Sequence, residues 1–554
     1  MGKWFKSGTP WIWMTGGAVS LSLIAVLGLF LLIGWRGLSF FWPATVYELS
    51  VEKTAGQESV LIGEIYDTEH VLKQQLIDAG VTGLENEPDS LSRYLIKIGN
   101  REYVDLDFQW ILESHIKNKN IADNVAVFER TKNGNFYGYI EAINENNKKL
   151  DLESSTLVSE LTKRIQRALD FRDKEHDLLT GDIGHINYAL DRIRLNQRKL
   201  ELELDGELTD QKISEFTAES DALRAQYLTL EADLFSYREQ ARRDSVTVKD
   251  MTGRLVTMPL SYILDFYQPN NMGFFEKVGH WFHQVYKFVS DDPREANTEG
   301  GVFPAIFGTV FMVMLMAVIV TPFGVIAAIY LHEYAAKNSF TKFIRIAVIN
   351  LAGVPSIVYG VFGLGFFVYI LGGSIDQLFY PEALPTPTFG SPGVLWSALT
   401  LAILTLPVVI VSTEEGLSRI PSTLREGSLA LGATKSETLW RIVIPMASPA
   451  IMTGLILAVA RAAGEVAPLM LVGVVKIAPT LPIDGNFPFL HLDRKFMHLG
   501  FHIYDVGFQS PNVEAARPLV YATSFLLVTV IIGLNLAAIS IRNNLREKYR
   551  SLEH

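Results

Sequence analysis

The sequence predicts an α-helical integral membrane protein with six spans and a large water-exposed domain of mixed α and β structure inserted after the first span. The chain of 554 residues is 49% hydrophobic yet 20% charged, with a formal net charge of −11. One soluble domain would be less apolar and a simple membrane bundle less charged, so the two parts are expected as separate blocks. The chain has no cysteine, which excludes disulfides, zinc–thiolate sites and thiol nucleophiles. Its acidic balance argues against a nucleic-acid partner.

The first predicted span covers residues 11–35, an apolar run long enough for a bilayer crossing of about 20 residues. A cleaved signal peptide is the alternative. The run is longer than a signal-peptide core, and residues 37–41 offer no small-residue cleavage site. We therefore expect a retained anchor. Lys3 and Lys6 precede it and place residues 1–10 in the cytoplasm.

Residues 36–297 are polar and acidic and are expected to form the water-exposed domain. Alternating apolar and polar residues around turn residues predict β-rich parts at 50–147 and 245–260. The expected strand pairs are 94–98 with 103–106, 125–128 with 136–140, and 245–248 with 254–257.

The part between these β-rich segments, 155–243, carries apolar residues at heptad spacing on both sides of Asp205 and Gly206. This spacing predicts a long antiparallel helical hairpin of coiled-coil type, inserted into the β domain. The apolar stripe is interpreted as a packing seam rather than a cofactor site. An amphipathic stretch at 274–289 then leads back towards the membrane.

Five further spans are predicted near residues 303–331, 344–371, 394–413, 448–473 and 518–541. Basic residues follow the second, fourth and sixth spans: Lys337, Lys342, Arg345, Arg419, Arg425, Lys435, Arg441, Arg542, Arg546, Lys548 and Arg550. The loop at 372–393 has no lysine or arginine. This asymmetry predicts six spans with the domain outside and both termini, including the tail at 547–554, in the cytoplasm.

No enzyme signature is found. Residues 432–436 resemble a phosphate-binding loop only faintly, because the glycine before Lys435 and the upstream glycine are missing. His491, His498 and His502 share one outer loop and could in principle bind a metal, but loop histidines are more often solvated. We therefore predict no catalytic residue, no metal site and no cofactor bound by this chain.

The stretch 426–445 has a glycine near its middle and strongly apolar runs on both sides. It is expected to form two helical pieces broken at Gly432, and another protein is expected to bind it. Glu426, Gly432 and the sequence Ile442-Val443-Ile444-Pro445 resemble the EAA loop of ABC-transporter permeases, with Gly427 and Ser428 where that family usually has alanines. The resemblance implies that Glu426, Gly432, Ile442 and Pro445 couple the chain to a separate ATPase, which binds ATP and Mg²⁺. An ordinary amphipathic cytoplasmic helix is the alternative.

Three further strings, at 300–309, 350–360 and 461–468, narrow the resemblance to permeases of the high-affinity phosphate importer, the PstA type most closely. The resemblance covers about residues 298–546 and implies an ABC importer permease core there, in a bacterial inner membrane with the large domain in the periplasm. It also implies a second homologous permease, an ATPase dimer and a periplasmic phosphate-binding protein as partners. The outer domain is far larger than the usual family connection.

Arg461 and Glu465 are the predicted substrate-pathway residues. At positions i and i+4 they share one face of a helix and can form an ion pair. An ionisable group within a span costs about 2.5–3.5 kcal/mol on insertion scales, so it usually faces a bundle interior or a pathway. Arg461 is expected to meet phosphate and Glu465 to hold the arginine; a purely structural pair is the alternative. Gly353, Pro355, Gly360 and Gly464 are predicted to permit close helix packing and kinks.

Two other functions remain open at this point. The same transporter could move another oxyanion such as sulfate or molybdate, or the chain could be a membrane-anchored coiled-coil adaptor or sensor without transport. The acidic outer domain repels phosphate, so it is expected to serve as a docking platform for the solute-binding protein or another envelope protein.

Overall fold

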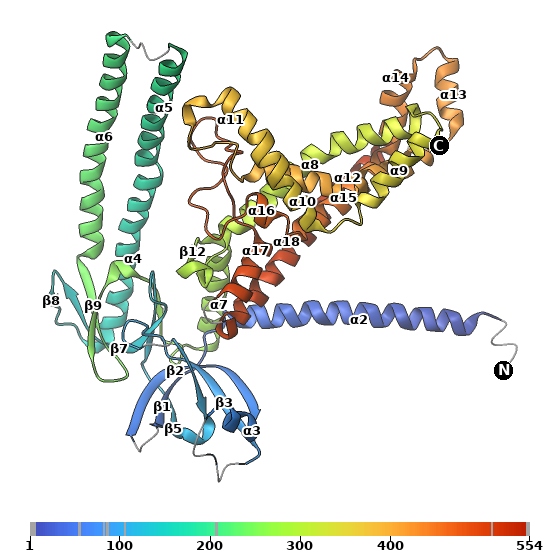
Figure 1. Cartoon of the computed structure of the whole chain (residues 1–554). Coiled ribbons are helices and arrows are strands. Elements are labelled where there is room, and N and C mark those ends of the chain that lie inside the picture. The colour runs from blue at the N-terminus through green and yellow to red at the C-terminus, as the bar shows by residue number, and fades with distance from the viewer. Residues whose placement is uncertain are drawn as a thin grey trace. The chain divides into compact units, whose positions relative to one another are not determined.

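The chain folds as two units, which are described separately (Figure 1). The computed structural model describes residues 7–53, 57–80, 84, 88–104, 107–204, 209–510 and 513–549. The first unit consists of Met1–Phe40, Val289–Asn297 and Gly301–His554, and the second of Phe41–Phe288 and Thr298–Gly300. Lys3, Lys6 and Arg550, which support the predicted orientation, and the predicted turn at 205–206 lie outside the described residues.

Long apolar helices build the first unit. Six of its described helical stretches are long and apolar enough to cross a membrane: Pro10–Ser39, Phe303–Tyr334, Ser356–Phe379, Val394–Ser418, Lys435–Gly464 and Ala516–Asn544. They correspond to α2 (Thr9–Ser39), α8 (Phe303–Ile329), α10 (Ser356–Phe362) with α11 (Gly373–Phe379), α12 (Val394–Ser418), α15 (Ile444–Gly464) and α18 (Val513–Tyr549). The number of spans agrees with the sequence prediction.

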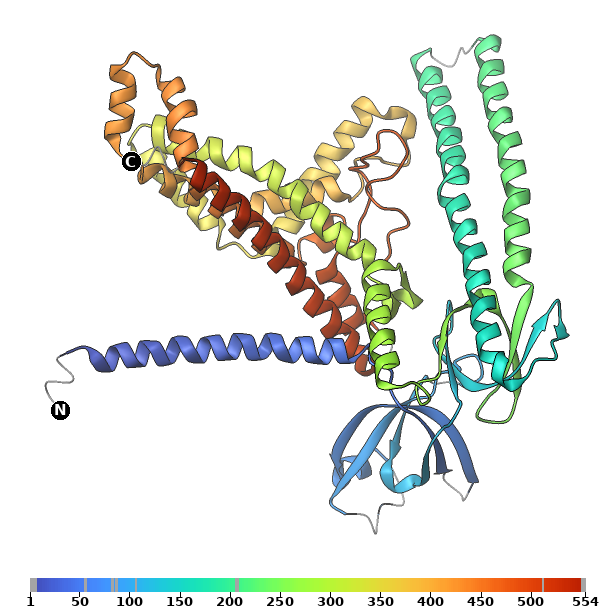
Figure 2. The ribbon, with the colours of Figure 1, turned by 180° about the vertical axis from the view of Figure 1, so that it is seen from behind.

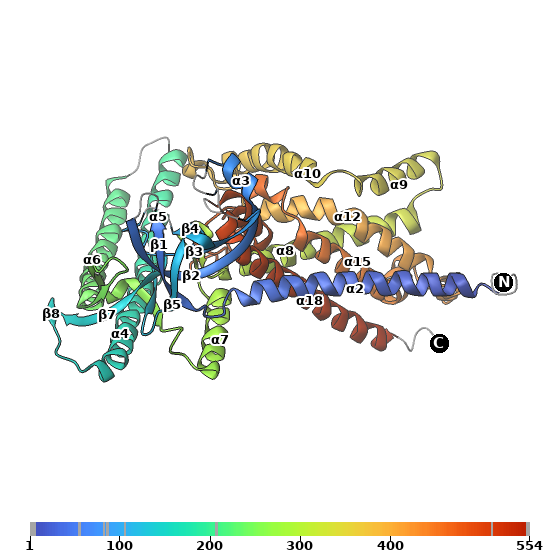
Figure 3. The same ribbon diagram turned by 90° about the horizontal axis from the view of Figure 1, so that it is seen from below.

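Helix α12 lies at the centre of this unit and packs against both α8 and α15. Met312 and Val313 of α8, Leu401 of α12 and Ala462 of α15 meet in one core from which water is excluded. At the edge of the unit, the C-terminal end of α2 packs against α18, as Figure 3 shows. A Cβ at Gly37 would lie 2.7 Å from the Ala522 Cα, so a glycine is needed for this close approach.

The third and fifth predicted spans differ from the structure at proline-containing segments. The prediction of one helix at 344–371 was wrong: α9 (Ser339–Leu351) ends before Pro355, and the span starts at Ser356. A proline disfavours helical backbone at the preceding residue and has no N–H to donate. The fifth helix was expected at 448–473 but ends at Gly464, ahead of Pro468.

Two antiparallel sheets form the base of the second unit. The first has strand order β4-β3-β2-β1-β5 and the second β10-β9-β7-β6-β11, with the short β8 (Lys148–Lys149) paired to β7. Their strands are β1 (Val46–Lys53), β2 (Gln57–Leu72), β3 (Ser90–Lys97), β4 (Phe108–Leu112), β5 (Ile116–Ile121), β6 (Ala126–Arg130), β7 (Phe136–Glu145), β9 (Asp244–Lys249), β10 (Leu255–Pro259) and β11 (Ile263–Tyr267).

Two of the three predicted strand pairs are present close to the predicted residues. Val127 lies opposite Tyr137 across Asn133 and Gly134, whose φ values of 67° and 66° suit a tight hairpin. Thr247 lies opposite Thr257. The return arm predicted at 103–106 was wrong, because Tyr103 and Val104 turn back to the Asn100 carbonyl and the strand begins only at Phe108. Asp105 and Leu106 lie outside the described residues.

Three helices extend from the sheets: α4 (Ser154–Thr180), α5 (Asp182–Glu203) and α6 (Asp210–Arg242). Helix α6 packs along both α4 and α5 and runs in the opposite direction (Figure 2). Ile183, Ile186 and Leu234, from the predicted apolar pattern, are buried. The break at Gly181, which divides the first arm into α4 and α5, was not predicted.

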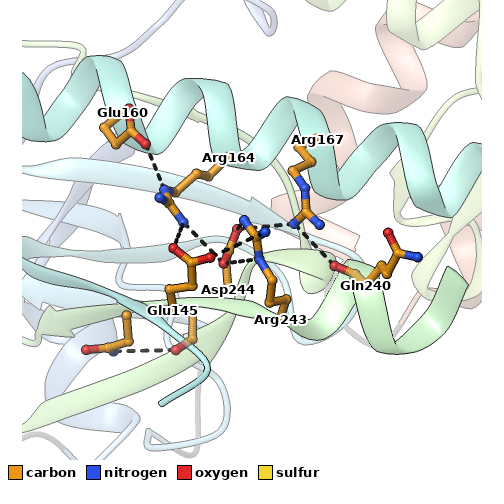
Figure 4. Close-up of polar contacts among 9 residues, drawn as sticks. Glu145, Glu160, Arg164, Arg167, Gln240, Arg243 and Asp244 are labelled. Carbon is orange, nitrogen blue, oxygen red and sulfur yellow. Dashed lines mark hydrogen bonds and ion pairs between the residues drawn. The ribbon is translucent and has the colours of Figure 1, made fainter. Parts of the chain in front are cut away.

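A cluster of charged residues attaches these helices to the sheet, where α6 ends and β9 begins (Figure 4). The carboxylate of the buried Asp244 lies 3.2 Å from Arg164, 3.4 Å from Arg167 and 2.8 Å from Arg243. Glu145, at the end of β7, pairs with Arg164 at 3.1 Å and with Arg243 at 3.3 Å. The cluster therefore joins α4, β7 and the α6–β9 junction.

Candidate functional site

The stretch 426–445 takes in the second half of a short helix, α13 (Ser422–Ala430), and all of another, α14 (Lys435–Thr438), at one end of the first unit (Figure 1). The predicted break at Gly432 is present, with a φ of +87° that glycine adopts without strain. Thr434 and Glu437 form a capping box that starts α14. The chain then runs through a π-helical turn at Leu439–Val443 into α15.

Buried and charged contacts hold this two-helix segment in place. The Ser428 hydroxyl lies 2.9 Å from that of Thr438, so the two pieces are joined across the turn. Arg425 forms an ion pair of 3.0 Å with Glu333, in the π-helical turn Tyr330–Tyr334 that follows α8, and Lys435 donates to the Glu333 backbone carbonyl. Sequence reasoning did not identify Glu333, although an acidic residue directly after an apolar run could have signalled it.

Large apolar side chains are exposed on the segment among polar ones. Leu431, at the turn, is 91% exposed and Trp440 is 69% exposed. Glu426 is also exposed, whereas Ile442 and Pro445 are half-buried where the segment joins α15. A Cβ at Gly427 would meet no atom within 4 Å, so an alanine would fit there. Of the four predicted coupling residues, Glu426 and Gly432 are therefore exposed and Ile442 and Pro445 are half-buried.

Arg461 and Glu465 lie at the C-terminal end of α15. The Arg461 Nε is 3.6 Å from the Glu465 Oε1, although Glu465 has extended backbone (φ −81°, ψ 131°) and stands just past the helix. The two side chains are 33% and 20% exposed, whereas Ala458 and Ala462 are fully buried in the core. Arg461 therefore faces away from the core and is partly open to solvent.

Two of the three strings that carried the resemblance contact each other, and the third contacts the loop around 497–499. A Cβ at Gly360 would lie 2.7 Å from the Pro468 Cα, and one at Gly308 would lie 2.1 Å from the Met497 carbonyl oxygen. The Thr309 hydroxyl accepts a hydrogen bond of 2.9 Å from the Leu499 N–H. The 461–468 string thus contacts the 350–360 string, while the 300–309 string contacts the loop around 497–499.

The four predicted packing residues divide into two kinds. Gly360 makes the backbone contact just described, and Pro355 stands at the helix break. Gly353 has only the Asn350 carbonyl near a Cβ position, at 3.5 Å, and Gly464 has no atom within 4 Å. Sequence reasoning missed Tyr359, whose hydroxyl donates to the Leu351 carbonyl at 2.6 Å and lies within electrostatic reach of Arg461.

Comparison with known proteins places this chain in a family. Residues 320–551 match the binding-protein-dependent transport system inner membrane component. The phosphate transport system permease protein PstA of Mycobacterium leprae is 31% identical over 55% of this chain and 90% of that protein. PstA 1 of Mycobacterium tuberculosis is 36% identical over 48% of this chain and 77% of that protein. The chain belongs to the PstA-type family of ABC-transporter permeases.

The same region is similar to a second kind of permease. The probable phosphate transport system permease protein PstC of Methanocaldococcus jannaschii is 30% identical over 40% of this chain and 73% of that protein. The PstA-type chain is a multi-pass membrane protein, because it has six apolar helices long enough to cross a membrane and belongs to a family of membrane permeases.

The three histidines at 491, 498 and 502 of this PstA-type chain contact different residues and do not form one cluster. His491 lies 2.8 Å from Asp484, whose pKa falls to about 2: burial opposes its ionisation, but the Asn486 N–H, Arg494 and His491 outweigh burial. His498 caps the helix Leu499–Tyr504, and burial lowers the pKa of His498 and of His502 to about 4. Among the described residues, no group of three or more histidine or carboxylate side chains could hold a metal ion.

Proposed function

We propose that this chain is the transmembrane permease subunit of an ATP-driven importer of inorganic phosphate. The observation that carries the proposal is the half-exposed Arg461, paired with Glu465 in a string that resembles those of PstA-type permeases and that packs against the similar string at 350–360. A guanidinium suits an oxyanion because its planar N–H groups match the oxygens of phosphate. In this proposal Glu465 keeps Arg461 oriented and offsets its charge when no substrate is bound.

The two-helix segment 422–443 would couple the spans to a cytoplasmic ATPase. The exposed Leu431 and Trp440 offer an apolar contact, which is the usual centre of a protein interface. The ion pair between Arg425 and Glu333 would transmit a movement of this segment to the turn Tyr330–Tyr334 and through it to α8. ATP and Mg²⁺ would bind to the partner ATPase, and its closure would rock the spans between inward-facing and outward-facing states.

The proposed assembly contains a second, homologous permease, an ATPase dimer and a periplasmic phosphate-binding protein. The chain would lie in a bacterial inner membrane, with its termini in the cytoplasm and residues 36–297 in the periplasm. Basic residues after the second, fourth and sixth spans support this orientation. The helices α4, α5 and α6 would then be the docking platform for the phosphate-binding protein.

Phosphate uptake by the assembled transporter tests the site. Arg461→Ala should lower phosphate uptake about 30-fold or more, because a hydrogen-bonded charge contributes about 2–3 kcal/mol. Glu465→Gln should lower phosphate uptake by less, because Arg461 remains to bind phosphate. Lys495→Ala removes an exposed cation in the outer loop and should leave uptake unchanged.

The outcomes separate the alternatives. Equal losses in Arg461→Ala and Glu465→Gln would indicate a structural pair, and unimpaired phosphate uptake in Arg461→Ala would refute the site. The same assays with sulfate and molybdate, on the unaltered transporter, decide whether another oxyanion is the substrate. An adaptor without transport would have no use for an ATPase-binding segment, so failure to co-purify with an ATPase would favour that function.

A further inference from the structure

An exposed aromatic stripe runs along α7 (Phe274–Ser290), most of which belongs to the second unit. Phe275 is 87% exposed, Phe282 63% and Tyr286 69%. Their spacing of seven and four residues places them on one side of the helix. Large aromatic side chains in such a row are not accounted for by the fold of the sheets or by the transport site.

The opposite side of α7 is fixed to the second sheet. Lys287 forms an ion pair of 2.8 Å with Glu129 of β6, and the His280 ring lies 4.2 Å from the Tyr267 ring of β11. These contacts determine the rotation of the helix about its axis. The stripe of Phe275, Phe282 and Tyr286 therefore points away from the sheet and is left exposed by the described residues of the unit.

Chain continuity places this helix next to the end of a membrane span. Helix α2 ends at Ser39, and the ring of Trp42, three residues later, lies 6.2 Å from the Phe274 ring. Phe41 packs against Phe288 with ring centroids 5.1 Å apart. Three residues reach at most about 10 Å, so both ends of α7 lie close to the point where the chain leaves the bilayer. Beyond α7 the chain re-enters the next span at Phe303.

We propose that the aromatic stripe of α7 lies in the lipid headgroup region of the leaflet from which α2 emerges, and so anchors the outer domain to the membrane surface. Phenylalanine, tryptophan and tyrosine are the side chains favoured at that depth. A helix with one aromatic side and one polar side binds parallel to the bilayer plane and buries its apolar side at the boundary between headgroups and acyl chains. Here the polar side binds the sheet rather than water, so the helix connects the domain to the lipid.

Single-cysteine labelling tests the proposal, because the chain has no cysteine of its own. The full chain carrying Phe282→Cys is labelled with a nitroxide and reconstituted in vesicles of phosphatidylethanolamine and phosphatidylglycerol. Accessibility to oxygen, which concentrates in lipid, is compared with accessibility to a water-soluble nickel chelate. Leu228→Cys on α6 is the matched control, because Leu228 is also 63% exposed and is a large apolar residue.

At position 282 oxygen should be favoured over nickel, and at position 228 the order should reverse. A label at 282 as open to nickel as the one at 228 would mean that the stripe faces water, and exclusion of both reagents would mean that a protein covers it; either result overturns the proposal. Phe275→Cys and Tyr286→Cys repeat the measurement in case one substitution prevents folding, and they should give the pattern of position 282.

Discussion

Gly360 and Gly464 are alike in the sequence but differ in their surroundings. Gly360→Ala would bring a Cβ to 2.7 Å from the Pro468 Cα, and this contact with backbone cannot yield by a rotamer change. We expect a loss of about 1–3 kcal/mol of stability from the forced shift. Gly464→Ala, with no atom within 4 Å of the new Cβ, is the control and should be nearly neutral. Thermal unfolding of the purified chain in detergent measures both, and equal effects would contradict the packing role of Gly360.

Residue patterns predicted part of the candidate site. An arginine and a glutamate four positions apart were expected to pair on one helix face, and their side chains do approach, although Glu465 lies beyond the helix end. Spacing alone could not show this, because the end depends on Gly464 and Pro468. Tyr359 and Glu333 were not predicted, because each is held by a contact outside its own helical turn. A periodic pattern in the sequence does not show such contacts.

The two-helix segment 422–443 presents its most exposed apolar residue, Leu431, at the turn. Leu431→Asp should weaken co-purification with the ATPase by about 30-fold, since losing a central apolar contact costs about 2 kcal/mol. The spans should stay folded because the Leu431 side chain is 91% exposed. Leu228→Asp on α6 is the control and should bind the ATPase normally. Undiminished ATPase binding by Leu431→Asp would argue against this face as the coupling surface.

The charged cluster around Asp244 determines how firmly α4 and α6 are attached to the sheet. Asp244→Asn keeps the side-chain shape but leaves Arg164, Arg167 and Arg243 short of a buried negative charge. We expect a loss of about 3 kcal/mol, seen as faster amide hydrogen exchange at 154–180 and 244–249. Asp191→Asn breaks an exposed pair with Arg194 on α5 and should cost less than about 1 kcal/mol. Similar exchange in the two variants would mean that the cluster is not structural.

Helices marked by long apolar runs or by heptad spacing of apolar residues could be predicted, but the breaks within them could not. Apolar runs indicated all six spans, and heptad spacing indicated α5 and α6, because burial of one face dominates both patterns. The break at 352–355 was missed although Pro355 lies within the predicted helix, since hydropathy outweighed a local backbone restriction. The return strand at 108–112 was missed because a turn at Asn100 lengthens the loop.

At the scale of the whole molecule, the helices α4, α5 and α6 cannot be removed as a whole without damaging the β domain from which they extend. Leu161, Ile165 and Ala168 of α4 are buried together with Val246 and Val248 of β9. Removing residues 150–240 would therefore take away part of the core of the second sheet. Arg238 pairs with Glu175 at 2.7 Å farther along the helices, and beyond this level the helices no longer belong to the sheet core.

Replacing residues 182–231 with a short glycine-rich turn removes α5 and the distal part of α6 while keeping the Glu175–Arg238 pair and the sheet core. If these helices are the docking platform, binding of the periplasmic phosphate-binding protein and phosphate uptake should both fall, whereas co-purification with the ATPase should be unchanged because the 422–443 segment is untouched. Uptake by cells and binding to the reconstituted transporter measure the two effects. Since an acidic domain cannot concentrate phosphate by long-range attraction, a loss of uptake without a loss of protein binding would contradict the platform, as would no loss of either.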